Sequence, residues 1–402
     1  MRILLINKFY YRRGGDCIYM LNLEQLLRSR GHEVAVFAMD YPDNLDSPWR
    51  GYFPSDMSAA MALTRPFGSR EVRRQFGRLL RDFRPDVVHL NNIHTQLSPV
   101  VAEMAHRRGV RVVWTLHDYK LLCPRYDCLR GGVEVCESCH GGRKRGCLTH
   151  RCMKGSLLAS AVGYAEALAW HRRRLEVCTD AFICPSRFMA KKMAGGGFSA
   201  EKLHTLCNFI DVDRCHRFAY DKGDYYCYVG RLSHEKGVRT LITAANRLPD
   251  HPLTIVGDGP LMDELHRMAG PHIRFVGHRS WDELKVIVGR SRFTVVPSEW
   301  YENNPLSVIE AQCLGTPVLG ARIGGVPELI DEGQTGMTFE SRNVDDLHRT
   351  IAQRWNARFD YARIAHTAME RYDAGAYYDK LMAIYPPHYR LLTLNITAAW
   401  AA

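Results

Sequence analysis

Long apolar runs are missing from this chain. Although 46% of its 402 residues are hydrophobic, no run of 18 or more apolar residues occurs. A helix needs about 20 such residues in succession to cross a bilayer, so no membrane span is expected. The apolar start, residues 1–7, is too short for a signal peptide. We therefore expect a globular chain that stays in the cytoplasm.

Aromatic residues are missing from the basic runs. The net charge is +11, and residues 1–207 hold 32 Lys and Arg against 19 Asp and Glu. The densest basic stretches are 143–145 and 172–174. Without interleaved aromatic side chains, these runs do not favour nucleic acid as a partner. They suit an anionic membrane surface or a phosphate-bearing acceptor, and the alternative is a solvated face with no partner.

Length and strand pattern predict two α/β domains. A chain of 402 residues exceeds one ordinary core. A doubly wound α/β domain is predicted to begin with strand 2–9, a glycine loop, helix 17–29 and strand 32–39. The same alternation of strands and helices resumes at residue 225. We predict a first domain over 1–210, a second over 211–370, and a helix and tail over 371–402 that cross back to the first domain.

A helix start near residue 304 is the strongest local signal. The β-branched strand 293–296 ends at a proline, and a helix is expected to follow it. Asn304 is predicted as its N-cap, Pro305 as its first residue and Gly315 as the glycine just past its end. The free amides at such a start attract an anion, and here they would belong to Leu306, Ser307 and Val308.

Charged side chains flank this predicted anion site. Glu302 precedes the helix and Glu310 lies within it, and carboxylates beside an anion site suit the hydroxyls of a sugar or ribose. Arg231 and Lys236 lie in a loop that follows a strand, where a guanidinium fork and an ammonium would suit a diphosphate. The alternative is a capped helix with solvated charges.

Two residues of the first half follow predicted strands at the same edge. His117 comes after strand 111–116, where it could bind a sugar hydroxyl or carry a proton. The alternative is a core histidine satisfied by a neighbouring carbonyl. Gly15 follows the first strand, where bare backbone can approach a phosphate.

Six of the 13 cysteines lie between residues 123 and 152. Cys136 and Cys139 have the spacing of metal ligands, and a cytosolic chain would keep such thiols reduced. We predict a structural zinc site, and free thiols or a redox-dependent disulfide are the alternatives. The predicted ligands are Cys123, Cys136, Cys139 and Cys152.

Taken together, the motifs resemble those of the retaining glycosyltransferases of family 4. The motifs are the helix start after Gly15, His117 at the end of strand 111–116, GRLSHEKG, VGDGP and EWYENNPLSVIEAQCLGTPVLGARIGGVPELI. The cysteine-bearing segment 123–152 is similar to an insertion found in a subgroup of these enzymes. The resemblance implies the GT-B fold, an α/β architecture of two Rossmann-like doubly wound domains that face each other across a cleft.

The resemblance also implies roles for single residues. Arg231 and Lys236 would grip the diphosphate of a nucleotide-diphosphate-sugar donor, Glu302 would hold the hydroxyls of the transferred sugar, and Glu310 would hold the ribose. His117 would lie near the sugar on the acceptor side.

The remaining contacts to the donor would come from backbone. The stretch of Asn303, Asn304, Pro305 and Leu306 would complete the pocket, Gly15 would face the diphosphate from the other domain, and the segment around Gly277 would face the base.

The function implied is transfer of a sugar, with retention, to a saccharide or lipid-linked saccharide in cell-surface polysaccharide biosynthesis. No catalytic metal is expected, and UDP is favoured over GDP. Peripheral contact with the inner face of an anionic membrane is also expected. The competing hypothesis is a non-catalytic scaffold that binds sugar nucleotides, or is stabilised by zinc, and docks on an anionic surface.

Overall fold

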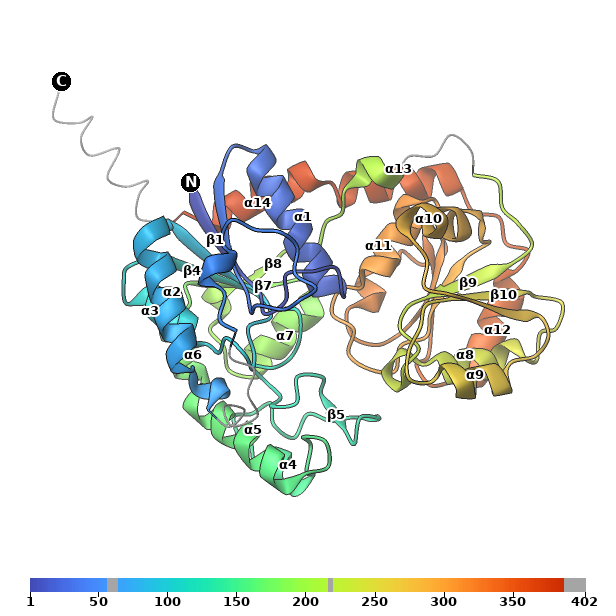
Figure 1. The fold of residues 1–402 in the computed structure, drawn as a ribbon. Coiled ribbons are helices and arrows are strands. Elements are labelled where there is room, and N and C mark those ends of the chain that lie inside the picture. Colours follow the sequence, from blue (N-terminus) through green and yellow to red (C-terminus); the bar gives the residue numbers. More distant parts are fainter. Residues whose placement is uncertain (56–63, 216–219, 387–402) are drawn as a thin grey trace.

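The chain forms two lobes, each built around a parallel sheet (Figure 1). The structure is a computed structural model that describes residues 1–55, 64–215 and 220–386. Every helix in these residues is too short or too polar to span a lipid bilayer.

The first lobe holds six strands in the order β2-β1-β3-β4-β7-β8. Every neighbouring pair is parallel. The strands are almost wholly apolar because helices cover both faces of the sheet. They are β1 (Arg2–Ile6), β2 (Glu33–Phe37), β3 (Val87–Leu90), β4 (Arg111–Thr115), β7 (Ala181–Cys184) and β8 (Leu203–Thr205).

The helices of this lobe present apolar stripes to the sheet. In α2 (Arg70–Phe83), Ser69 caps the first turn by accepting a bond from the Val72 amide, and Phe76 and Leu79 are fully buried. The others are α1 (Gly15–Ser29), α3 (Val100–His106), α4 (Gly146–Thr149), α5 (Leu157–Ala169), α6 (Arg172–Val177) and α7 (Arg187–Gly195). The cysteine-bearing insertion adds a small hairpin, β5 (Leu129–Arg130) and β6 (Glu134–Val135).

The second lobe repeats this plan with the order β11-β10-β9-β12-β13-β14. Its strands are β9 (Tyr226–Val229), β10 (Leu253–Val256), β11 (Ile273–Gly277), β12 (Thr294–Val296), β13 (Val318–Ala321) and β14 (Gly336–Phe339). Its helices are α8 (Val238–Ala245), α9 (Met262–Met268), α10 (Trp281–Arg290), α11 (Leu306–Cys313), α12 (Val344–Arg354) and α13 (Tyr361–Arg371). The fold therefore comprises two doubly wound α/β domains.

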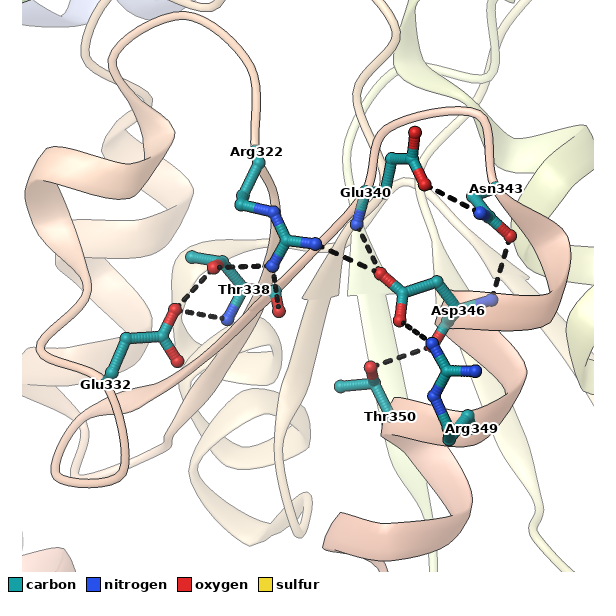
Figure 2. Close-up of polar contacts among 8 residues, drawn as sticks. All are labelled: Arg322, Glu332, Thr338, Glu340, Asn343, Asp346, Arg349 and Thr350. Atoms are coloured by element: carbon teal, nitrogen blue, oxygen red, sulfur yellow. Dashed lines mark hydrogen bonds and ion pairs between the residues drawn. The ribbon is translucent and has the colours of Figure 1, made fainter.

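A polar network ties α12 to the edge of the second sheet (Figure 2). Asp346, in the first turn of α12, accepts bonds from the Glu340 amide at 2.7 Å and from Arg322 at 3.2 Å. The Glu340 bond is the main reason that the pKa of Asp346 is lowered. In β14, which ends just before Glu340, the amide of Thr338 donates to Glu332 at 3.0 Å. These groups are mostly exposed, so they fix the sheet edge rather than form a site.

The last described helix, α14 (Ala374–Ile384), returns to the first lobe and packs beside α1 (Figure 1). The Tyr377 hydroxyl bonds that of Tyr19, and the hydroxyl of Tyr385 lies 2.6 Å from Nδ1 of the buried His89. Leu381 and Ile384 join the core of the first lobe. Residues 387–402, the end of the predicted tail, lie outside the described residues.

Candidate active site

Helix α11 begins later than predicted. Its N-cap is Pro305 in an extended conformation and its first residue is Leu306, so the assignment of Asn304 as N-cap and of Pro305 as first residue is wrong. The side chain of Asn304 cannot cap the helix because its Oδ1 accepts the backbone N–H of Asn208, from the first lobe, at 3.0 Å. The predicted glycine past the helix end is confirmed, since Gly315 has φ +70° and follows the C-cap.

The start of α11 nevertheless leaves free backbone donors. The Val308 amide bonds the Pro305 carbonyl at 3.1 Å, so the prediction that this amide is free is wrong. The amides of Leu306 and Ser307 have no acceptor among the described residues. Two unpaired amides at the positive end of a helix dipole can bind an anion.

The first turn of α1 lies against this helix start from the other lobe. Gly15 is the first residue of α1 and is exposed. A methyl group added at Gly15 would come within 4.0 Å of Leu306 Cδ1. Two helix N-termini, one from each lobe, therefore lie close together, and both favour negative charge.

Lys236 and Glu302 form the ionic pair at this place. The ammonium of Lys236 lies 2.6 Å from Glu302 Oε1, and the Ser298 hydroxyl donates to the same oxygen at 2.7 Å. Burial alone would raise the pKa of Glu302, but the ammonium and the Ser298 bond outweigh it and hold that pKa below its ordinary value. The carboxylate is ionised and stays available to accept further hydrogen bonds.

A glycine allows the loop that carries Lys236 to pack against the residues that follow β12. Gly237 follows Lys236 with φ +68°, and a Cβ there would lie 1.9 Å from the Pro297 carbonyl oxygen. The Glu299 amide also bonds the Glu235 carbonyl at 2.9 Å. The GRLSHEKG loop therefore lies directly on the segment that carries Glu302, although 66 residues separate the two charges.

Arg231 lies exposed in the same loop. Its carbonyl accepts the Tyr228 hydroxyl at 2.9 Å, and the next residue, Leu232, donates its amide to the Asp258 carbonyl at 2.9 Å. Within the described chain, nothing bonds the Arg231 guanidinium. The backbone is thus fixed while the charged end is open to a ligand.

Glu310 lies half-buried on α11. Its carboxyl group makes no hydrogen bond with the described residues, and burial raises its pKa to about 7, against the opposing charge of Arg214. An unsatisfied carboxyl group of this kind suits a ligand that brings hydroxyl donors. Gly277 ends β11 at the carboxyl edge of the same sheet, with φ +70° and open space where a Cβ would lie.

His117 lies just after β4 and is held as a neutral imidazole. Burial lowers its pKa to about 4, with Asp16 opposing the shift. Its Nε2–H donates to Asn91 Oδ1 at 2.9 Å, since the amide nitrogen of Asn91 is directed to the Ile6 carbonyl. Nδ1 then carries the lone pair and can accept a hydroxyl proton. The oxygen that satisfies Nε2–H is the side-chain carbonyl of Asn91, and Nδ1 stays open for a hydroxyl.

The segment 301–304 joins the two lobes, which the sequence did not predict. The side-chain amide of Asn303 donates to the Leu116 carbonyl at 2.7 Å, and its oxygen accepts from Ser186 at 2.8 Å. Tyr301 and Asn304 also contact the first lobe. Glu302 alone in this segment is directed to Lys236 in its own lobe. No sequence signal marked Tyr301, because contacts between lobes leave no local pattern.

The insertion brings its thiols together. Cys123, Cys136, Cys139, Cys147 and Cys152 line one cavity, and every cysteine is free. In the part of the chain that the structure describes, no three potential ligands are placed to hold a metal ion. Zinc at Cys123, Cys136, Cys139 and Cys152 therefore stays a prediction, which elemental analysis of the purified protein tests.

Family comparisons agree with this geometry. Residues 13–214 match the family described as Glycosyltransferase Family 4, and residues 211–371 match Glycosyl transferases group 1. The chain belongs to glycosyltransferase family 4. Membership of this family favours the predicted transferase over the scaffold hypothesis.

Single relatives cover different parts of this glycosyltransferase. A glycogen synthase of Mycobacterium tuberculosis is 40% identical over 133 residues, which is 31% of this chain and only about a third (32%) of that enzyme. A GDP-mannose-dependent phosphatidylinositol monomannoside mannosyltransferase of the same organism is 26% identical over 384 residues, 88% of each chain. Among solved structures, Anabaena HepE in complex with UDP superposes with a TM-score of 0.63 at 17% identity, over 95% of this chain and 99% of HepE. The predicted GT-B fold is confirmed.

Proposed function

We propose that this glycosyltransferase takes a sugar from a nucleotide-diphosphate-sugar and transfers it, with retention, to a saccharide or lipid-linked saccharide in cell-surface polysaccharide biosynthesis. The observation that carries the proposal is the Lys236–Glu302 pair beside the two unpaired amides of α11. Opposite charges that neutralise each other in the free protein can separate when a ligand brings both an anion and hydroxyl donors.

The proposed binding step is an exchange of partners. The diphosphate accepts hydrogen bonds from the amides of Leu306 and Ser307 and forms an ion pair with the ammonium of Lys236. The open guanidinium of Arg231 adds a forked contact. Glu302, released from Lys236, then accepts the sugar hydroxyls. Gly15 lets the backbone of the first lobe approach the diphosphate. The backbone of Asn303, Asn304 and Pro305 completes the pocket.

The proposed chemical step is attack by the acceptor hydroxyl on the anomeric carbon, from the face that the diphosphate leaves. The carbon–oxygen bond to the diphosphate breaks, the new glycosidic bond forms on the same face, and a departing phosphate oxygen takes the hydroxyl proton. Lys236, Arg231 and the dipole of α11 stabilise the charge that develops on the leaving group. Neutral His117 orients a sugar hydroxyl through Nδ1. No catalytic metal is needed in this scheme.

UDP is the proposed nucleotide and GDP the second candidate. HepE is a fold neighbour in complex with UDP, whereas the mycobacterial relative is GDP-mannose-dependent. In this proposal the backbone around Gly277 meets the base.

A donor panel tests the proposed function. The purified chain is mixed with UDP- and GDP-sugars and a lipid-linked saccharide acceptor, and the nucleoside diphosphate released is measured. Acceptor-dependent release from one donor, with the anomeric configuration retained in the product by NMR, is the expected result. Tight nucleotide binding without release from any donor would contradict it and favour a binding module.

Glu310 makes the affinity for the donor depend on pH. Ribose hydroxyls that donate to the carboxylate favour its ionised form, so the proton held below pH 7 must leave on binding. The donor KM is expected to fall about tenfold as pH rises from 6 to 8, since one pH unit below the pKa leaves about one site in ten ionised. Glu310→Gln should remove this dependence and keep a high KM throughout. A wild-type KM that does not change with pH would contradict the role of Glu310.

Helix α5 is the proposed contact with the inner face of an anionic membrane. Leu157, Leu158 and Leu168 are 57%, 70% and 49% exposed and lie on one face, while its single charged residue, Glu166, is buried in a 2.7 Å pair with Lys120. Exposed basic residues flank the helix at Arg151, Lys154 and Arg173. An apolar face between cations suits anionic lipid.

Vesicle binding tests this surface. Leu158→Glu/Leu168→Glu is expected to lower affinity for phosphatidylglycerol vesicles at least about tenfold, because each leucine contributes about 1.5–3 kcal/mol when buried. Val286→Glu is the matched control, since Val286 is 50% exposed on α10 of the other lobe. Equal binding by both variants in a sedimentation assay would place the contact elsewhere.

A further inference from the structure

Tyr301 extends from the second lobe into an aromatic group of the first. Its ring centroid lies 4.9 Å from that of Phe188 and 5.9 Å from that of Tyr119, and both pairs are edge-to-face. The ammonium of Lys192 lies 5.0 Å from the same centroid. The ring is therefore held by first-lobe residues, although the chain on both sides of it belongs to the second lobe.

The hydroxyl of Tyr301 has its own partner in the cysteine-bearing insertion. It donates to Glu137 Oε1 at 2.5 Å, and the Lys192 ammonium pairs with the same oxygen. Burial raises the pKa of Tyr301, and the bond to Glu137 raises it further, so the hydroxyl keeps its proton. A hydrogen bond to a charged acceptor is stronger than one between neutral groups.

The chain on both sides of Glu137 is bonded within the insertion. The amide of Cys136 donates to the Cys128 carbonyl at 2.7 Å, and the Lys144 ammonium donates to the Cys139 carbonyl at 3.0 Å. The insertion makes a second contact with the other lobe, from Arg342 to the Val133 carbonyl. The insertion is thus an ordered bridge between the lobes.

This bridge ends one residue from Glu302. Adjacent Cα atoms are about 3.8 Å apart, so a shift of Tyr301 moves the backbone of Glu302 with it. Asn303 and Asn304 are bonded to the first lobe on the other side. The carboxylate of Glu302 therefore takes its position between two anchors in the opposite lobe.

We propose that Glu137 is a positioning residue for sugar transfer: by holding the Tyr301 hydroxyl, it fixes the segment that presents Glu302 to the donor. This inference rests on the proposed role of Glu302. Glu137 itself does not touch the reacting atoms, and the cysteine-bearing insertion thereby gains a role in donor binding.

The test removes the hydrogen bond from each side. Tyr301→Phe keeps the ring and loses the hydroxyl, and Glu137→Gln keeps the shape and loses the charge. Each is expected to lower kcat about three- to tenfold, because Glu302 is less well placed in the transition state, and the double variant should be no worse than the more affected single one, because one shared bond is lost. Tyr378→Phe is the matched control, since it removes a hydroxyl that bonds His32 of the first lobe from α14, and its kcat should not change.

A second readout needs no donor. Amide hydrogen exchange over residues 298–304 should be faster in Tyr301→Phe than in wild type, with the strands of both sheets unchanged. Unchanged exchange in this segment, an unchanged kcat in both single variants, or additive effects in the double variant would each overturn the proposal. Failure of the wild-type enzyme to release nucleoside diphosphate from any donor would instead overturn the proposed function, and the exchange measurement would still decide whether the contact positions the segment.

Discussion

Turnover of the Glu302→Gln variant is expected to fall at least about 100-fold, which corresponds to about 2.7 kcal/mol of lost transition-state stabilisation. Glutamine keeps the shape and can still accept the Ser298 hydroxyl, so the fold should be retained. It loses the charge that makes bonds from sugar hydroxyls strong, and it leaves the ammonium of Lys236 without a negatively charged partner.

The control for this variant is Glu332→Gln. Glu332 accepts from Thr338 on the exposed network of Figure 2, in the same lobe as Glu302. Its substitution should change turnover by less than about twofold, because Glu332 is exposed and surface substitutions usually change the free energy of unfolding by no more than about 0.5 kcal/mol. Initial rates at saturating donor make the comparison. If Glu302→Gln turned over like wild type, Glu302 would have no part in the reaction.

The Lys236→Ala variant is expected to lose at least about 100-fold in turnover for a different reason. The ammonium would stabilise the leaving diphosphate, so its loss should lower kcat more than it raises the donor KM. The substitution also leaves a buried carboxylate without its cation. Because Lys236 is partly exposed, we expect a reduced penalty of about 1–3 kcal/mol in the free energy of unfolding.

A double variant separates chemistry from stability. Lys236→Ala/Glu302→Gln removes the stranded charge, so its melting temperature should recover toward that of wild type while its activity stays low. Lys285→Ala is the control, since Lys285 forms an exposed 2.6 Å pair with Asp282 and should tolerate the change. Activity restored together with the melting temperature would show that Lys236 acts only through stability.

The placement of Lys236 beside Glu302 could be anticipated in part. Each residue lies in a loop that follows a buried parallel strand, and the carboxyl ends of such strands share one edge of a sheet. How the two loops pack at that edge depends on Gly237, which contacts the carbonyl of Pro297, 60 positions away in the sequence. The sequence shows that residue 237 is a glycine, but it does not show that its φ angle is positive.

By itself, the sequence determined the two doubly wound domains, the strand before α11 and the glycine that ends that helix, because hydrophobic period and turn chemistry act over a few residues. The tertiary structure decided the use of Asn304, which bonds Asn208 instead of capping α11. It also decided that Tyr301 meets Glu137 across the lobes and that Lys236 neutralises Glu302. These contacts join residues 66 to 164 positions apart, and only the packing of one lobe on the other, or of one loop on another, brings such atoms within hydrogen-bond distance.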